Sequence, residues 1–256
     1  MRQNVYLDGD PGGPWLGHVP TEVGCIWRGP TQGEVITRGP GEIARFLGWL
    51  REHGEPGVTP VDAAAVKAHV VEVRQVPGLG RPGGPVGLFG PDRQPATDKD
   101  IETAVRRFGY ARRDLLEVVA GLEPEVLDWP PPSRLSVEQA GQAVPRPTAP
   151  SRTVRRHLEH LAESQARYLS RLLEPDAVRA ALPEPWPKDT FSRLEWVADR
   201  AVGLVLELPR RLRSGVFRAP DSGEEWTARK LLRRLVEHER EHVEAVARIA
   251  ELRRRT

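Results

Sequence analysis

Residues 227–253 read TARKLLRRLVEHEREHVEAVARIAELR and carry the pattern that decides the fold of the second half of the chain. Apolar residues and two histidines recur three or four positions apart, which is the period of one face of an α-helix. The positions on this face are Leu231, Leu235, His238, His242, Val246 and Ile249. Thr227 is a suitable N-cap residue for the helix. Because both histidines stand where a core residue is expected, each needs a partner inside the protein.

Three further amphipathic helices precede this one. They are expected at about 98–122, from Ser151 or Thr153 to about Leu173, and at about 190–213, where Pro209 can kink or end the helix. Four helices with one apolar stripe each are buried most simply in a four-helix bundle. The connection at 123–150 is long for such a bundle, and connections of this length are crossovers, functional covers or disordered segments.

The first 76 residues have a different pattern. Short extended runs bounded by Gly or Pro lie at 4–9, 15–20 and 25–29. The sequence PGGP at 11–14 is typical of a hairpin connection. A helical pattern follows at 42–54, and an alternating run at 69–76 predicts a last strand. The order strand, strand, strand, helix, strand predicts a small α+β domain.

Residues 77–97 read PGLGRPGGPVGLFGPDRQPAT and are dominated by Gly and Pro. Such a composition predicts a linker without regular structure. The chain is therefore expected to consist of an α+β domain at 1–76, this linker, and an all-α bundle at 98–256. A length of 256 residues agrees with two domains of ordinary size.

Composition limits the classes of function. The 38 basic and 36 acidic side chains nearly cancel, so charge alone does not indicate general nucleic-acid binding. A single cysteine, Cys25, excludes an intramolecular disulfide framework and a zinc site made of several cysteines. We expect Cys25 to be a buried strand residue. No apolar run approaches the roughly 18 residues of a membrane span and the first residues do not resemble a leader, so we expect a cytoplasmic protein without a membrane partner.

The string from His238 to His242 is also a literal H-E-x-x-H, the motif of zinc metallopeptidases. Two imidazoles at positions i and i+4 point the same way and form half of a metal site. A peptidase also needs a third ligand, usually downstream, and a strand that binds the substrate, whereas residues 243–256 continue the helical pattern. An HExxH metallopeptidase is therefore a minor alternative, and a pair of core histidines without metal stays open.

The acidic residues beside these histidines have two interpretations. Glu239 lies about 100° around the helix from His238, and Glu241 about 100° from His242. We expect a solvated acidic edge that pairs with Arg234 or Arg248. The alternative is that Glu239 acts as a general base.

An upstream third ligand has two candidates, His157 and His160, both on the helix expected to end near Leu173. On a helical wheel His157 lies about 60° from the centre of the apolar stripe, and His160 lies more than about 100° away, near Arg167 and Arg171. This geometry favours His157, although a site in a cleft between two helices need not lie on the axis of the core stripe. Tyr168 belongs to the stripe and is expected in the core.

The stretches RTVRRHLEHLAESQARYLSRL (152–172) and EEWTARKLLRRLVEHEREHVEAV (224–246), together with the four-helix layout, resemble the DinB-like superfamily. That group includes the YfiT-like thiol S-transferases and mycothiol-dependent isomerases. In its pattern a histidine in a context such as HLAESQARYL supplies one metal ligand, and H-x-x-x-H on the last helix supplies two. The resemblance implies a triad of His160, His238 and His242, with His157 as the substitute for His160.

The resemblance also implies a function. The metal would be a divalent ion, zinc, nickel, manganese or iron. Three imidazole ligands leave positions open for water or substrate, as in catalytic sites. In the related transferases the metal is thought to bind a low-molecular-weight thiol and lower its pKa, so that the thiolate attacks an electrophile. We therefore expect a metal-dependent thiol S-transferase or hydrolase, which can form a homodimer as such bundles often do.

The N-terminal stretch GHVPTEVGCIWRGPTQGEVITRGPGEIARFLGWLREHGE (17–55) is similar to the HicB-like antitoxin domain. The matching residues are Trp15, His18, Val19, Pro20, Gly24, Cys25, Gly29, Thr31, Ile43, Leu47 and Leu50. The resemblance implies an interaction module for a partner protein or RNA, and His18 is expected to be structural. Gly33 and the GPG at 39–41 predict a loop in the first half of its helix. The alternative for the whole chain is a non-enzymatic binding or scaffold protein that acts through this domain.

Overall fold

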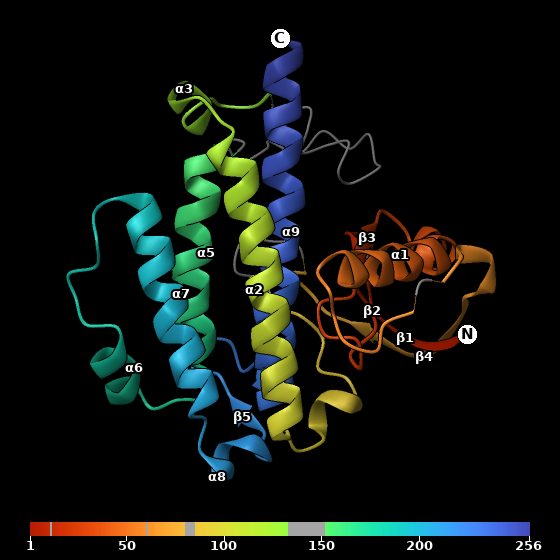
Figure 1. Cartoon of the computed structure of the whole chain (residues 1–256). Helices are drawn as coiled ribbons and strands as arrows, with labels where there is room; N and C mark the ends of the chain where they lie inside the picture. Colours follow the sequence, from red (N-terminus) through yellow and green to blue (C-terminus); the bar gives the residue numbers. More distant parts are fainter. Residues whose placement is uncertain (11, 60, 80–84, 133–151) are drawn as a thin grey trace. The chain divides into compact units, whose positions relative to one another are not determined.

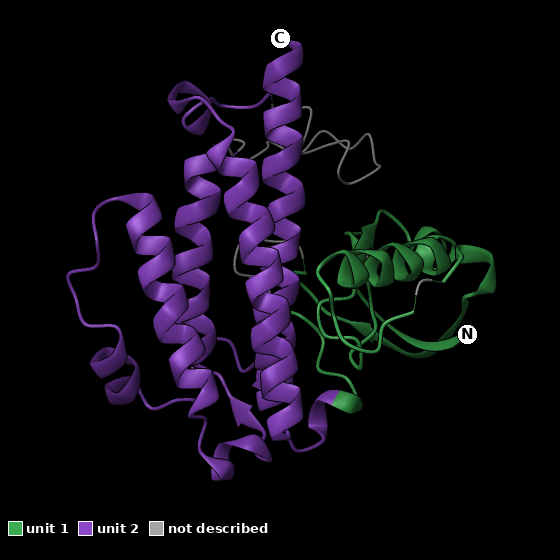
Figure 2. Ribbon diagram, viewed as in Figure 1, with its two compact units in different colours: residues 1–91, 134–147 green, residues 92–133, 148–256 purple. Residues whose placement is uncertain are grey.

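The computed structural model describes residues 1–10, 12–59, 61–79, 85–132 and 152–256. These residues form two compact units, which are coloured separately in Figure 2. Unit 1 holds the described residues up to Pro91, and unit 2 holds those from Asp92 onward. No helix in the described ranges has an apolar stretch long enough to cross a membrane.

Unit 1 is a four-stranded sheet with one long helix. Its strands are β1 (Arg2–Gly9), β2 (Trp15–His18), β3 (Ile26–Gly29) and β4 (Lys67–Gln75), in the order β3-β2-β1-β4. Strand β2 is antiparallel to β1 and β3, whereas β4 is parallel to β1. Helix α1 (Gln32–Glu52) and a short 3-10 turn, η1 (Ala63–Ala65), connect β3 to β4. The predicted order of strand, strand, strand, helix and strand is therefore confirmed.

Helix α1 begins ten residues earlier than the sequence predicts. Thr31 caps its N-terminus by accepting a hydrogen bond from the amide of Glu34, and the helix continues through Gly39 and Pro40 without interruption. The prediction of a loop in this half is wrong because tertiary packing outweighs local propensity. Gly39 lies under the ring of Trp27, whose Nε1–H donates to the carbonyl oxygen of helix residue Val35 at 2.8 Å.

The segment after β4 is more ordered than its Gly and Pro content predicts. Phe89 is completely buried, with its ring 5.4 Å from Tyr6 and 5.3 Å from His18. His18 Nε2 lies 2.9 Å from a carboxylate oxygen of buried Asp8, whose other oxygen accepts from the amide of Gly87 at 2.6 Å. The expectation of no regular structure is also wrong at the 3-10 turn η2 (Pro91–Arg93). His18 has the structural surroundings that were expected, and Cys25 is buried.

Unit 2 contains the four long helices that the apolar periodicity predicts, and Figure 1 shows them side by side. They are α2 (Asp98–Ala120), α5 (Val154–Leu169), α7 (Thr190–Leu206) and α9 (Ala228–Arg255). Helix α9 packs along α2 and α5, and α7 packs on α5 and, less extensively, on α2. The N-caps are Thr97, Thr153, Asp189 and Thr227, and each side chain accepts a hydrogen bond from the first turn. The bundle prediction is confirmed for these helices.

Shorter elements in unit 2 were not predicted. They are helices α3 (Pro124–Leu127), α6 (Pro175–Ala181) and α8 (Arg210–Arg213), and the hairpin of β5 (Phe217–Arg218) and β6 (Glu225–Trp226). Helix α7 stops before Pro209, as the proline suggested. Most of the long connection at 123–150 lies outside the described residues.

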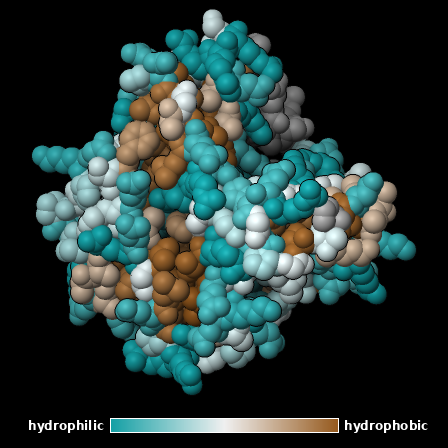
Figure 3. All heavy atoms as spheres, viewed as in Figure 1, coloured by the Kyte–Doolittle hydropathy of each residue, from teal (hydrophilic) through white to brown (hydrophobic). Residues whose placement is uncertain are grey.

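Apolar side chains also reach the surface of unit 2. Figure 3 shows a brown strip between α7 and α2, where a shallow pocket lies. Its lining residues are Ala104, Val105, Phe108, Ala201, Val202, Val205, Leu232 and Leu235.

Candidate metal centre

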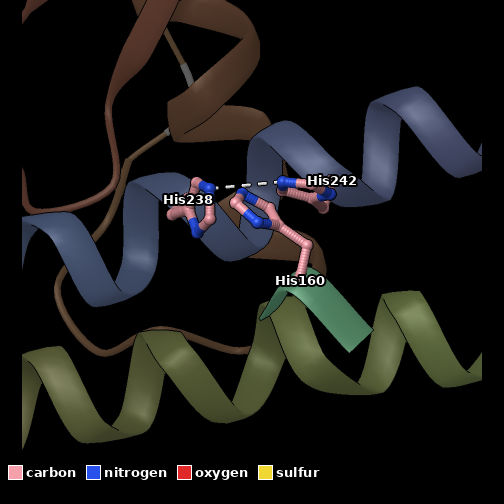
Figure 4. Close-up of side chains that lie close together, drawn as sticks. All are labelled: His160, His238 and His242. Carbon is pink, nitrogen blue, oxygen red and sulfur yellow. Dashed lines mark hydrogen bonds between the residues drawn. The ribbon is translucent and has the colours of Figure 1, made fainter. Parts of the chain in front are cut away.

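Three histidine side chains from two helices converge inside unit 2 (Figure 4). His160 comes from α5, and His238 and His242 come from successive turns of α9. One ring nitrogen from each lies within 4.8 Å of the other two. The ring centroids are 5.1 Å apart for His160 and His238, 5.2 Å for His160 and His242, and 4.6 Å for His238 and His242. The structure thus brings together the three residues that the sequence resemblance implies.

The three rings are held in their neutral form. Burial, with the positive charges of Arg152 and Arg167 as further causes, lowers the pKa of His160 to about 4. The pKa values of His238 and His242 are lowered well below the usual range, first by burial and then by neighbouring imidazoles and arginines. Neutral imidazole carries the free electron pair that a metal ion requires. All three residues can therefore donate to a cation at neutral pH.

The hydrogen bonding of His238 fits an additional ligand. Its Nε2 lies 3.2 Å from Nε2 of His242, while its buried Nδ1 has no hydrogen-bond partner among the described residues. A neutral ring has one N–H group and one lone pair, so one of these groups stays unsatisfied whichever tautomer is present. A buried polar atom without a partner is costly. The cluster therefore offers more nitrogen atoms than the described residues satisfy, and its donor set suits a divalent ion.

His157, the substitute candidate, lies behind His242 rather than in the triad. Its Nδ1 is 2.8 Å from Nδ1 of His242, and the two rings meet edge to face with centroids 4.8 Å apart. Burial lowers the pKa of His157 to about 4, so its Nδ1 can accept the Nδ1–H of His242. Metal-ligating histidines usually donate their second nitrogen to such a partner, which fixes the orientation of the ring. The contact leaves Nε2 of His242 directed into the cluster.

Glu239 is a buried cross-brace and not part of a solvated edge. Its side chain is completely buried, one oxygen accepts from Arg112 of α2 at 2.5 Å, and the other accepts from Gln165 of α5 at 3.1 Å. Arg112 also donates to the carbonyl oxygen of Leu194 in α7 at 3.1 Å. The expectation of a solvated Glu239 paired with Arg234 or Arg248 is therefore wrong. The same expectation is correct for Glu241, whose partly exposed carboxylate lies 3.5 Å from Arg234.

The hydrogen bonds of Glu239 argue against a role as a general base. A base must be free to accept a proton from a bound water or substrate. Here both carboxylate oxygens already accept hydrogen bonds, and one of the donors is a guanidinium that favours the ionised, bound state. The geometry thus gives Glu239 a structural task that joins α9 to α2 and α5.

Residues on α5 complete the surroundings of the triad. Ser164 Oγ lies 3.4 Å from Nε2 of His160 and accepts a hydrogen bond from Arg167 at 3.2 Å. Tyr168 is buried, as expected of a core residue, but its ring also lies 5.6 Å from that of His238. The helical wheel already places Arg167 near His160, whereas the sequence analysis did not identify Ser164 as a neighbour. The position of Ser164 four residues after His160 was the available signal, since such residues share one helix face.

A buried ion-pair network fixes α9 one turn before the triad. Arg233 donates to both carboxylate oxygens of Asp92 at 3.1 and 2.9 Å and to Glu237 at 3.1 Å, and Arg234 also donates to Glu237 at 3.1 Å. The hydroxyl of Thr227 donates to the carbonyl oxygen of Asp92 at 2.7 Å. These contacts attach the first turns of α9 to the segment that precedes α2.

Comparisons with known proteins address the bundle. The family model described as the DinB superfamily matches residues 107–246, which is more than half of the chain and includes all three histidines. A solved structure of YfiT from Bacillus subtilis, described as a probable metal-dependent hydrolase with an unusual four-helix bundle topology, is 18% identical. The similarity covers 66% of this chain and 94% of that one, with a TM-score of 0.44. No curated protein matches the sequence. The family match leaves out unit 1, whose HicB-like character stays a prediction.

Proposed function

This chain belongs to the DinB superfamily, and on that premise we propose that unit 2 is a metal-dependent enzyme that binds one divalent ion through His160, His238 and His242. The observation that carries the proposal is the convergence of three neutral ring nitrogens within 4.8 Å. These nitrogens come from two helices that are far apart in sequence, and burial keeps them unprotonated. Such a cluster is costly unless something binds it.

The ligand set narrows the choice of metal. Imidazole nitrogen suits zinc, nickel and iron, whereas manganese prefers carboxylate and water oxygens. Glu239 is engaged with Arg112 and Gln165, so it adds no oxygen ligand in this arrangement. Zinc, nickel and iron are therefore favoured over manganese among the four ions considered.

When bound, the ion would supply a nucleophile at neutral pH by lowering the pKa of a coordinated water or thiol. The described residues have positioning tasks around it. His157 orients His242, and Ser164 lies beside His160. We propose a hydrolase or a thiol S-transferase, the second with a low-molecular-weight thiol as cosubstrate and an electrophile as acceptor. Neither reaction needs a nucleophile from the protein, which agrees with the burial of Cys25 in unit 1.

The alternative functions, a metallopeptidase and a scaffold without enzymatic activity, differ from this proposal in what they require of the site. A metallopeptidase is not proposed, because the glutamate that would act as its base is occupied in the Arg112 contact. For unit 1 we propose an interaction module for a protein or RNA partner, supported by the order of its strands and helix. A scaffold without enzymatic activity would keep its partner binding after metal is removed, whereas the proposed enzyme would lose activity.

Metal content by plasma mass spectrometry tests the proposal. Tag-free protein should carry close to one equivalent of ion, and His160→Ala and His238→Ala should each lose it. The matched control is His69→Ala, because His69 is an exposed histidine on β4. Circular dichroism establishes that each variant is folded. Absence of bound metal in the wild type after incubation with zinc, nickel, iron and manganese in turn would overturn the proposal.

A further inference from the structure

Three arginines act on the triad electrostatically, and only one of them is neutralised. Arg152, Arg167 and Arg234 all lower histidine pKa values in this cluster. Arg234 is paired with Glu237 at 3.1 Å and with Glu241 at 3.5 Å.

Arg152 and Arg167 form no ion pair with any of the described residues. Arg152 feels the attraction of Glu163 but makes no hydrogen bond with the described residues, and it is also repelled by Arg167. Arg167 donates one hydrogen bond, to the neutral hydroxyl of Ser164. Neither positive charge is therefore in direct contact with a carboxylate of the described residues, and Arg152 has only the longer-range attraction of Glu163.

Several other arginines of unit 2 that are at least partly buried have either a carboxylate partner or, like Arg193 and Arg200, a backbone carbonyl oxygen. Arg112 is paired with Glu239, Arg171 with Asp221 through two hydrogen bonds of 2.6 and 2.9 Å, and Arg233 with Asp92. Taking a guanidinium out of water is costly unless an anion compensates for it. Among the described residues, Arg167 has neither a carboxylate nor a carbonyl partner for its hydrogen bonds and neither does Arg152, which points to a partner that these residues do not supply.

The position of Arg167 connects it to the triad. Its guanidinium donates to Ser164 Oγ at 3.2 Å, and the same oxygen lies 3.4 Å from Nε2 of His160. The guanidinium also lies 5.8 Å from the centre of the Tyr168 ring, which in turn faces His238. Such a planar group, resting against an aromatic ring, is suited to oxyanion recognition because its N–H groups match the oxygens of a carboxylate.

We propose that Arg167 binds an oxyanion of the substrate, a carboxylate in its simplest form, and that the positive charge of Arg152 adds to its attraction, while the triad holds the reacting end of the same molecule. This inference rests on the proposed function and adds the substrate class: a small molecule with an anionic group one or a few bonds away from the atom that reacts. The positive potential of the two arginines and of a bound cation draws such a molecule into the site.

Thiol binding to the cobalt-substituted protein tests the inference. The probes are 3-mercaptopropionate and 3-mercapto-1-propanol, which differ in the carboxylate and hydroxyl at the far end from the thiol. Binding is followed by the thiolate-to-cobalt charge-transfer band. The carboxylate probe is expected to bind at least about tenfold more tightly, since a hydrogen-bonded charge contributes that much. The preference should decrease as salt is added.

Variants test whether the two arginines cause the preference for the carboxylate probe. Arg152→Gln with Arg167→Gln should bring the affinity ratio close to one, and Arg167→Lys should retain part of it. The matched control is Arg156→Gln, which removes one positive charge from the same helix. Arg156 is 72% exposed and is paired with Glu159, so its replacement should leave the ratio unchanged.

The outcomes separate the two proposals. Absence of a cobalt spectrum overturns the proposed function and this inference with it. A normal cobalt spectrum with equal affinity for both thiols in the wild type overturns the inference alone, and this comparison needs no variant. A preference that survives in the folded double variant would also overturn it.

Discussion

Replacing Glu239 with alanine should remove a large share of the stability of unit 2. The Glu239 side chain is completely buried and that of Arg112 is 10% exposed, so solvent screens their interaction little. Removing one member of a buried ion pair leaves the other charge without compensation, at a cost of about 3–5 kcal/mol. A domain of this size is stable by only about 5–15 kcal/mol in total. The free energy of unfolding should therefore decrease by about a fifth or more.

Urea unfolding followed by the helical circular dichroism signal measures this change. Arg112→Met alone should be similarly destabilising because it leaves the buried carboxylate unpaired. The double variant Arg112→Met with Glu239→Leu should be more stable than the sum of the two losses predicts, since an apolar pair needs no charge compensation. Glu241→Ala is the control on the same helix, and its partly exposed contact with Arg234 should contribute less than about 1 kcal/mol. A loss below about 1 kcal/mol for Glu239→Ala, or strictly additive losses, would refute the reasoning.

Three further predictions concern the triad and the start of α9. His157→Ala should weaken metal affinity by about 10- to 100-fold in competition with a chromophoric chelator, because His242 loses the partner of its Nδ1; unchanged affinity would contradict that role. The pKa values of His157 and His160 are lowered from 6.5 to about 4, so the unfolded chain takes up protons first, and metal-free stability should decrease as pH falls from about 6.5 to about 4. Urea midpoints that stay constant across this window would contradict the buried, neutral state of these rings. Thr227→Ala should cost about 1–2 kcal/mol in urea unfolding because it removes the N-cap and the hydrogen bond to Asp92, whereas Thr227→Ser should recover most of the loss.

Periodicity was sufficient to predict the four long helices, because each one buries a single apolar stripe. It also placed His238 and His242 on the inner face of α9. The same reasoning gave the wrong environment for Glu239, about 100° away on the wheel. The neutralising partner, Arg112, is 127 residues distant in the sequence, and local spacing contains no information about such a contact.

The choice between His157 and His160 shows a second limit. The wheel measures distance from the apolar stripe of α5, whereas the triad forms where α5 contacts the inner face of α9. His157 lies nearer to the stripe and contacts the far side of His242, and His160 reaches the cluster. For α1, local helix propensity failed to predict the first half of the helix. The Trp27 contact that supports the helix around Gly39 and Pro40 is tertiary and cannot be seen in local sequence.

The origin of the triad in only two helices has a mechanical consequence. An ion held by His160 from α5 and by two residues of α9 would act as a non-covalent cross-link between helices separated in the chain by α6, α7 and α8. The cross-link can form only when the bundle is closed, so each tenfold rise in ion concentration above the dissociation constant adds about 1.4 kcal/mol to the stability of the closed form. Through the contacts of Glu239 with Arg112 and Gln165, the same restraint would also reach α2.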